Sequence, residues 1–461
     1  MKKLSGWLER SFTSTQFSYK ELRGMYLTLV LDQFFIMFIG FLSTAMVSST
    51  GEAAIAAANM VNSVSYLAIL VFTAVAVGGS VIIARAKGSG DDHSIRCALG
   101  EAICLAGVIG FVLGGLLTLL AEPIVNLLYP HAEPLLTEYS VRYMKLTCLA
   151  FFPYSIFNAI FHAFRSLGDT KSSLVLTVFI NVLHLILSFV FINVMGLGID
   201  GAGLSLLLAR LLGAVVALLW LLVIHNEHHI RIRHLFHFSK RITNEIIKLA
   251  VPIASEFILL QGGMLLVQIY LAYLTTTELA AHGVTSSYMQ LYNITGNALT
   301  SLASTVCGQC FGAGLYRELK RYNQSFIRLG RFIMLFTALL LVPLSPVLLK
   351  LYNPTEQAMP IIRQCILIFS VAMPFIWCES NITPMTLRAA GDVLYPTIVS
   401  VATLFSCRLA LGYYLTIVVG LGVPGVWIAL VVEWAVRAVL LKGRLSSKYW
   451  RNLMDKQAAA A

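Results

Sequence analysis

Long runs of apolar residues fill most of this chain, and short polar stretches separate them. Runs such as FIMFIGFLSTAMV and LLARLLGAVVALLWLLVI lack the alternating polar face of a helix on a soluble core. About 20 such residues span a bilayer as a helix. The pattern therefore predicts about twelve membrane helices, over residues 25–47, 54–84, 95–121, 140–164, 172–195, 201–224, 246–274, 280–310, 323–350, 360–387, 395–420 and 424–442.

Composition supports a membrane protein over a soluble one. Of the 461 residues, 58% are hydrophobic and only 12% are charged, whereas an average soluble domain is about 25% charged. So few charges cannot cover a soluble surface around so much apolar material. We expect an all-α polytopic membrane protein.

The net charge of +11 is explained by where the cations fall. Arg165 and Lys171 follow the fourth predicted helix and Arg388 follows the tenth, whereas the connections SSTGEA and GLGVPG contain neither Lys nor Arg. Cytoplasmic loops are the ones enriched in Lys and Arg. Both termini are therefore expected on the cytoplasmic side of a bacterial or archaeal plasma (inner) membrane.

The chain repeats itself at an offset of 223 to 224 residues. RSLGD at 165–169 returns as RAAGD at 388–392, and Asp32 falls on Glu256. Six helices per copy would make the copies parallel, which is a transporter architecture with a binding site between the halves. We predict two pseudo-symmetric six-helix bundles, residues 1–224 and 246–461, joined by a basic cytoplasmic linker at 225–245.

Polar residues recur along one face of two predicted helices. The first stripe is Thr177, Asn181, His184 and Ser188, and the second begins with Asn293 and Asn297. Spacings of three and four residues place each stripe on one helical face. Such stripes line a hydrated cavity or form hydrogen bonds between helices, and the sequence leaves both possibilities open.

Charged residues at membrane depth are the remaining candidates for chemistry. They are costly there, at about 2.5–3.5 kcal/mol on insertion scales, and usually serve a function or pair with a partner. Asp32 and Glu256 lie at the same depth of the first helix in each half, and Glu379 and Arg408 lie in the second half. A structural partnership with a neighbouring helix end is the alternative for the two repeated acids.

Several stretches together resemble the multidrug and toxic compound extrusion (MATE) family, within the multidrug/oligosaccharidyl-lipid/polysaccharide exporter superfamily. They include STGEAAIAA with TTTELAAHG, ARAKGSG with GQCFGAG, and GIDGAGLSLLLAR with GLGVPGVWIALVVEW. The resemblance implies two six-helix bundles around a V-shaped cavity. It also implies export of small organic, often cationic and amphipathic compounds by antiport with protons or sodium ions, through alternating access and without a cofactor.

The chain departs from the family pattern in its first half. Thr28 and Ser43 stand where many members carry a proline and an aspartate, and His184 stands where a second aspartate is expected after Asn181. If coupling to a cation persists, we expect it in the second half. The candidate cavity residues for substrate and cation are Asp32, Ser43, Thr177, Asn181, His184, Glu256, Asn293, Asn297, Glu379 and Arg408.

Other classes of protein fit less well. A lipid or lipid-linked glycan flippase of the same superfamily is the alternative function. An enzyme is not expected, because the chain contains neither HExxH nor GxSxG and no catalytic residue stands out. We expect no metal site and no nucleic-acid partner, and we expect a monomer whose partners are a small organic substrate and the bilayer.

Overall fold

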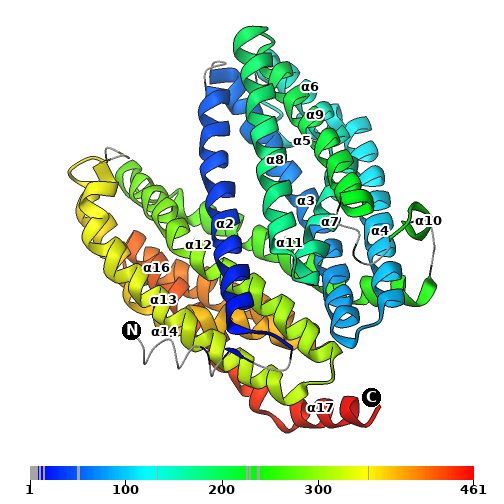
Figure 1. Cartoon of the computed structure of the whole chain (residues 1–461). Coiled ribbons are helices and arrows are strands. Elements are labelled where there is room, and N and C mark those ends of the chain that lie inside the picture. Colours follow the sequence, from blue (N-terminus) through cyan, green and yellow to red (C-terminus); the bar gives the residue numbers. More distant parts are fainter. Residues whose placement is uncertain are drawn as a thin grey trace. The chain divides into compact units, whose positions relative to one another are not determined.

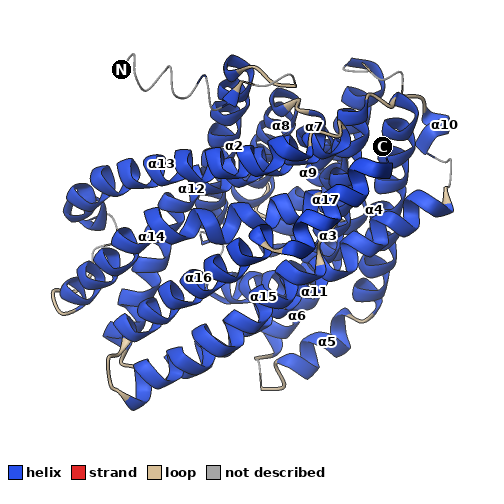
Figure 2. Cartoon of the chain, turned by 90° about the horizontal axis from the view of Figure 1, so that it is seen from below, coloured by secondary structure: helices blue, strands red, loops and turns tan. Residues whose placement is uncertain are grey.

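A computed structural model describes residues 9, 12–13, 16–48, 52–131, 133–224, 227, 230–235, 239–350, 352 and 354–460. Within this part of the chain every regular element is a helix and none is a strand, as Figure 1 and Figure 2 show. The predicted all-α membrane class is therefore confirmed.

The helices follow one another with short connections. They are α2 (Tyr19–Ser48), α3 (Glu52–Ser89), α4 (Asp92–Leu119), α5 (Ala121–Leu128), α6 (Pro134–Leu149), α7 (Phe151–Leu167), α8 (Thr170–Ser188), α9 (Gly198–Leu219), α10 (Ile232–Leu235), α11 (Lys240–Leu271), α12 (Thr276–Gly312), α13 (Tyr316–Lys350), α14 (Ala358–Ala389), α15 (Leu394–Thr403), α16 (Val423–Ser446) and α17 (Lys448–Ala460). Wider π-helical turns form η1 (Phe189–Val194), η2 (Trp220–Ile224), η3 (Leu404–Leu411) and η4 (Tyr414–Val418).

Ten helical runs in the described residues are long and apolar enough to cross a membrane, and the bent pair α6–α7 makes an eleventh. The helix α12, with 37 residues, is long enough but is not among them. The single helix predicted at 140–164 is in fact the two helices α6 and α7, between which the chain bends by 44°. Pro153 explains the break, since it has no N–H to donate to the carbonyl of Leu149.

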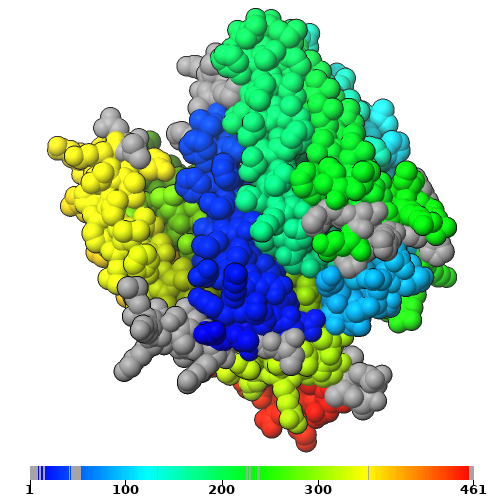
Figure 3. All heavy atoms as spheres, viewed as in Figure 1, coloured from blue at the N-terminus to red at the C-terminus, as the bar shows by residue number. Residues whose placement is uncertain are grey.

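Many large apolar side chains lie on the outside of the protein. On α8 they include Val175, Val182 and Ile186, and on α13 they include Phe336 and Leu339. Figure 3 shows α8 and α9, coloured green, at the surface. Soluble monomers rarely expose so much contiguous apolar area, so these faces are suited to contact with lipid.

The chain divides into two compact units. Unit 1 comprises Met1–Val30 and Ser255–Ala461, and unit 2 comprises Leu31–Ala254. The limits fall inside α2 and α11, so each of these helices begins in one unit and continues into the other. In this division the described residues up to Val30 belong with the second half of the chain, and residues 246–254 belong with the first.

Each unit has its own aromatic core. In unit 1, the rings of Tyr292 and Phe369 meet edge to face with centroids 5.3 Å apart, and Phe12 and Leu22 from the start of the chain join the same cluster. In unit 2, Phe72 packs on a ring of α7 within a separate cluster. Each set of helices is thus held together by burial of its own apolar faces.

The last part of the predicted linker, residues 239–245, belongs to unit 2 and contacts α4. Glu101 of α4 is buried and accepts hydrogen bonds from the backbone N–H of Ser239 and the hydroxyl of Thr243. The thiol of Cys104 donates to the carbonyl of Leu235, at 2.6 Å. The start of α11 is therefore anchored on α4.

The backbone records the internal repeat. Eight glycines of the described chain have positive φ, and they form four pairs 223 or 224 positions apart: Gly90 with Gly314, Gly168 with Gly391, Gly196 with Gly420, and Gly198 with Gly422. Gly168 and Gly391 have the same φ of 92°. The stretch RSLGDTK forms the turn between α7 and α8, with Gly168 ending α7 and the carboxylate of Asp169 capping the Ser172 N–H at 3.1 Å.

Candidate functional site

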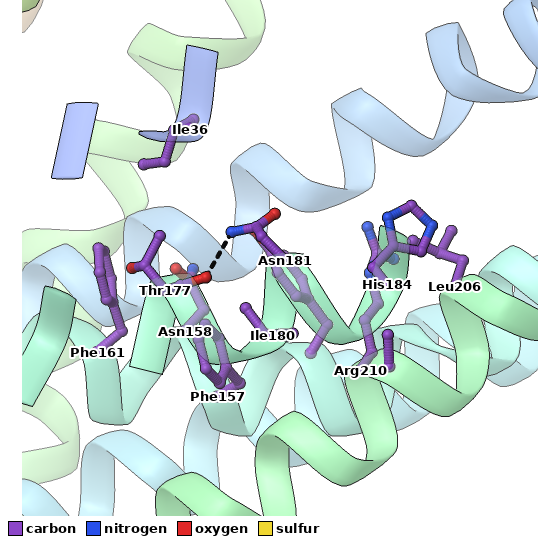
Figure 4. A pocket seen from close by; sticks show the side chains of 12 residues that line it. Ile36, Phe157, Asn158, Phe161, Thr177, Ile180, Asn181, His184, Leu206 and Arg210 are labelled. Carbon is purple, nitrogen blue, oxygen red and sulfur yellow. Dashed lines mark hydrogen bonds between the residues drawn. The ribbon is translucent and has the colours of Figure 1, made fainter. Parts of the chain in front are cut away.

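A cavity of about 240 Å³ lies inside unit 2, among α2, α7, α8 and α9 (Figure 4). It combines aromatic, amide, hydroxyl and basic side chains. Its lining residues are Ile36, Tyr154, Phe157, Asn158, Phe161, Thr177, Ile180, Asn181, His184, Leu206, Ala209 and Arg210.

One wall is formed by the first predicted polar stripe. Thr177, Asn181 and His184 project from the same face of α8 because they are four and three residues apart. The hydroxyl of Thr177 donates to the Ser173 carbonyl at 3.0 Å, and the amide of Asn181 donates to the Thr177 carbonyl at 2.8 Å. Ser188, the fourth member, instead forms a 2.8 Å hydrogen bond with Ser205 of α9.

The opposite wall comes from α7. The side-chain amide of Asn158 donates to the hydroxyl of Thr73 on α3, at 3.1 Å. This bond fixes the amide at the cavity wall. Phe157 and Phe161 of the same helix stack with centroids 6.3 Å apart and supply the apolar part of the lining.

Arg210 of α9 is a cavity residue that the sequence analysis did not single out. Its guanidinium carbon lies 4.3 Å from the centroid of the Tyr154 ring. Among the described residues no carboxylate pairs with it, and its buried Nη1 has no hydrogen-bond partner. Figure 4 shows Arg210 and His184 together at one end of the cavity and Phe161 at the other. The available signal was a single arginine within the apolar run GLSLLLARLLGAVV.

Asp32 lies near this cavity but does not line it. It is fully buried in α2 and accepts a hydrogen bond from Nη2 of Arg165 in an ion pair. The guanidinium carbon of Arg165 is 4.1 Å from the centroid of the Phe161 ring. Arg165, counted above among the loop cations, is therefore a buried partner of Asp32.

Glu256 has the same arrangement in unit 1. Nη2 of Arg388 lies 2.5 Å from its Oε2, and the hydroxyl of Thr397 donates to the same oxygen at 2.8 Å. Asp32 and Glu256 are related by the repeat, as are the two arginines. Each acid lies two residues beyond the point where its helix passes into the other unit.

The remaining candidates lie in unit 1, with one exception. Glu379 of α14 pairs with Arg331 at 2.7 Å and with Lys442 at 3.5 Å. Arg408, in η3, donates to Glu433, which also accepts from Arg437, so three charges form one cluster.

The two predicted asparagines of α12 differ in burial. Asn293 is half-buried and its Oδ1 has no hydrogen-bond partner in the described chain, whereas Asn297 is exposed. The exception outside unit 1 is Ser43, whose side chain lies outside the described residues. The structure thus brings Thr177, Asn181 and His184 together at one cavity and leaves the other candidates elsewhere.

The fold and the repeated buried pairs define a helical integral membrane protein made of two related units. The MatE family model matches residues 29–190 and 252–414, and the chain belongs to this family. The two matched segments start 223 positions apart and end 224 apart, which confirms the internal repeat. Members of this family are transporters of small compounds and not enzymes.

Relatives cover almost the whole chain. An uncharacterized transporter, YisQ, from Bacillus subtilis is 24% identical and aligns over 90% of this chain and 91% of its own length. A probable multidrug resistance protein, NorM, from Thermotoga maritima is 23% identical over 91% and 90%. The fold is similar to that of a MOP superfamily transporter from Pyrococcus furiosus, described as having a binding pocket of reverse polarity that suggests a different function. The TM-score is 0.83, with 18% identity over 92% of this chain and 95% of the other.

Proposed function

We propose that this protein is a secondary-active exporter of small organic compounds. It works by antiport with protons or sodium ions and by alternating access, in a plasma membrane with both termini cytoplasmic. One observation carries the proposal: the same buried acid–arginine pair occurs once in each of two related units. Two similar units that move against each other are the basis of alternating access in repeat-built transporters.

The helices α2 and α11 are the elements through which one unit can move relative to the other. Each belongs in part to both units, and each is fixed just past its crossing by the pair Asp32–Arg165 or Glu256–Arg388. A buried ion pair is costly to break, so each crossing helix stays attached to its unit.

His184 is the candidate for proton coupling, and it lies in unit 2 instead of the second half, where the sequence led us to expect coupling. It lines the cavity, and among the described residues it takes part in no ion pair. It can therefore gain or lose a proton without breaking a buried pair, and a proton on His184 adds a second positive charge beside Arg210. Asp32 and Glu256 are both neutralised by arginines, and this fits a structural role for them better than proton exchange.

Transport in proteoliposomes tests the proposal. The full chain is reconstituted, loaded with ethidium or with a sulfonated aromatic anion, and given a pH gradient or a sodium gradient in separate experiments. Efflux that accelerates with one gradient and stops when an ionophore collapses it is the expected result. His184→Gln should remove the response to a pH gradient, whereas Arg142→Gln, at an exposed position of the same unit, should not.

The flippase alternative has a different signature. Lack of response to both gradients for ethidium and for an anionic dye, together with binding of a lipid-linked sugar, would replace the exporter proposal with the flippase. Lipid scrambling or sugar binding is measured on the same vesicles, so one preparation decides between the two functions.

A further inference from the structure

We propose that the cavity of unit 2 is a binding site for a small organic anion, a carboxylate carrying a single apolar ring. The first argument is charge. The pair Asp32–Arg165 is neutral as a unit, and Arg210 then remains as a cation that no described carboxylate neutralises. A lone cation at membrane depth usually serves a ligand or ion pathway.

The second argument is the distribution of chemistry along the cavity. Arg210 and His184 lie together at one end, and Phe161 lies at the other (Figure 4). Asn158 and Asn181 stand on facing helices between them. An anion with its charge at the Arg210 end would place an apolar group against Phe161. A cationic compound in the same orientation would meet a like charge.

The third argument is size and geometry. The cavity of about 240 Å³ is just below the range of roughly 300–1,000 Å³ that is usual for small-molecule sites, so a single ring fits and a large drug does not. The planar guanidinium presents paired N–H groups that match a carboxylate bidentately. Arg210 lines the cavity, and no described carboxylate occupies its guanidinium, so this group is the donor that such a ligand would engage.

This inference rests on the proposed function, because the bound anion is taken to be a compound that the exporter transports. It departs from the cationic substrates that the family resemblance implies. Its test is a binding measurement that needs no gradient. Failure of gradient-driven transport with intact binding would refute the exporter proposal alone. Intact transport without anion binding would refute only this inference.

Isothermal titration on the purified full chain, in a chloride-free buffer, provides the test. The probes are benzoate, its neutral analogue benzamide, the cation benzylammonium, and chloride. We expect benzoate to bind and the two analogues to bind at least tenfold more weakly, which corresponds to about 1.4 kcal/mol. Arg210→Gln should lower the affinity for benzoate at least tenfold, and Arg142→Gln should leave this affinity unchanged.

A second variant keeps the test decisive if Arg210→Gln does not fold. Arg210→Lys retains the positive charge but loses the paired N–H donors of the guanidinium. The affinity for benzoate should therefore fall severalfold but stay above the affinity for benzamide. The proposal is overturned if benzylammonium or benzamide binds as well as benzoate. It is also overturned if chloride competes with benzoate equally well at the same concentration. The same holds if Arg210→Gln or Arg210→Lys leaves the affinity for benzoate unchanged.

Discussion

At the scale of single residues, the buried arginines fall into two kinds: those that pair with a buried acid and one that has no acid as a partner among the described residues. Arg165 and Arg388 neutralise acids that the repeat relates to each other. Arg210 contacts the Tyr154 ring and has no such acid among the described residues. The physical difference is whether the charge is compensated, and it predicts opposite effects of the same substitution at different positions.

Arg210→Met should stabilise the ligand-free protein. Removing an uncompensated charge at membrane depth recovers about 2.5–3.5 kcal/mol, and loss of the contact with Tyr154 costs about 0.5–2 kcal/mol. We expect a net gain of about 0.5–3 kcal/mol, seen as a higher thermal unfolding temperature in lipid nanodiscs. A lower unfolding temperature would show that the charge is compensated in the native protein.

Arg388→Met is the matched control and should have the opposite sign. It leaves Glu256 buried without its ion-pair partner, which costs about 3–5 kcal/mol. The double variant Glu256→Gln with Arg388→Met should recover part of this loss, because neither charge is then left alone. Additive effects of the two single substitutions would contradict a direct pair.

At the scale of elements, local signals in the sequence predicted turns well and tertiary partners poorly. Gly168 ends α7 and Asp169 caps α8 through their own residue types, without a distant partner. The partners Asp32 and Arg165 are 133 positions apart, so no local pattern joins them. The position of Arg210 beside His184 also depends on how α8 packs on α9.

The bend between α6 and α7 was predictable in principle. Pro153 marks it, but the apolar residues that continue across residues 140–164 led us to predict one helix there. Helix ends elsewhere also moved outward, as with α3, which extends to Ser89. Polar residues at helix ends lower the hydropathy without ending the helix.

Gly168→Ala should destabilise the chain at the turn between α7 and α8. A side chain is strained at a φ of 92°, at a cost of about 1–2 kcal/mol. Gly115→Ala is the control, because an added Cβ at this helical position meets no atom within 4 Å, and it should gain up to about 1 kcal/mol. Thermal unfolding of both variants gives the comparison, and equal effects would argue against the strained turn.

Asp91 caps α4 outside the membrane and gives a prediction for pH. Its carboxylate accepts hydrogen bonds from the side chain and backbone of Ser94, which lower the pKa of Asp91 below its ordinary value. A lowered pKa means that the cap stabilises the fold above the unfolded-state pKa and is lost as pH falls through the folded-state pKa. Asp91→Ala should therefore cost about 1 kcal/mol at pH 7 and progressively less below about pH 4.

At the scale of the whole molecule, the two units repeat one plan with different chemistry. The glycine turns and the acid–arginine pairs coincide under the repeat. The cavity with Arg210 is described in unit 2, while the cluster of Arg408, Glu433 and Arg437 belongs to unit 1. The sequence predicted the duplication because ordered matches at one offset survive divergence, but it could not predict which charges remain uncompensated.

We propose that this protein moves a small organic compound uphill at the expense of an ion gradient. The most direct measurement is accumulation of a permanently charged dye, either ethidium or a sulfonated aromatic anion, in proteoliposomes with equal dye on both sides. With the interior made acidic or rich in sodium, we expect one dye to become more concentrated inside than outside, and only when protein is present. Equal concentrations on both sides under both gradients, for both dyes, would contradict it.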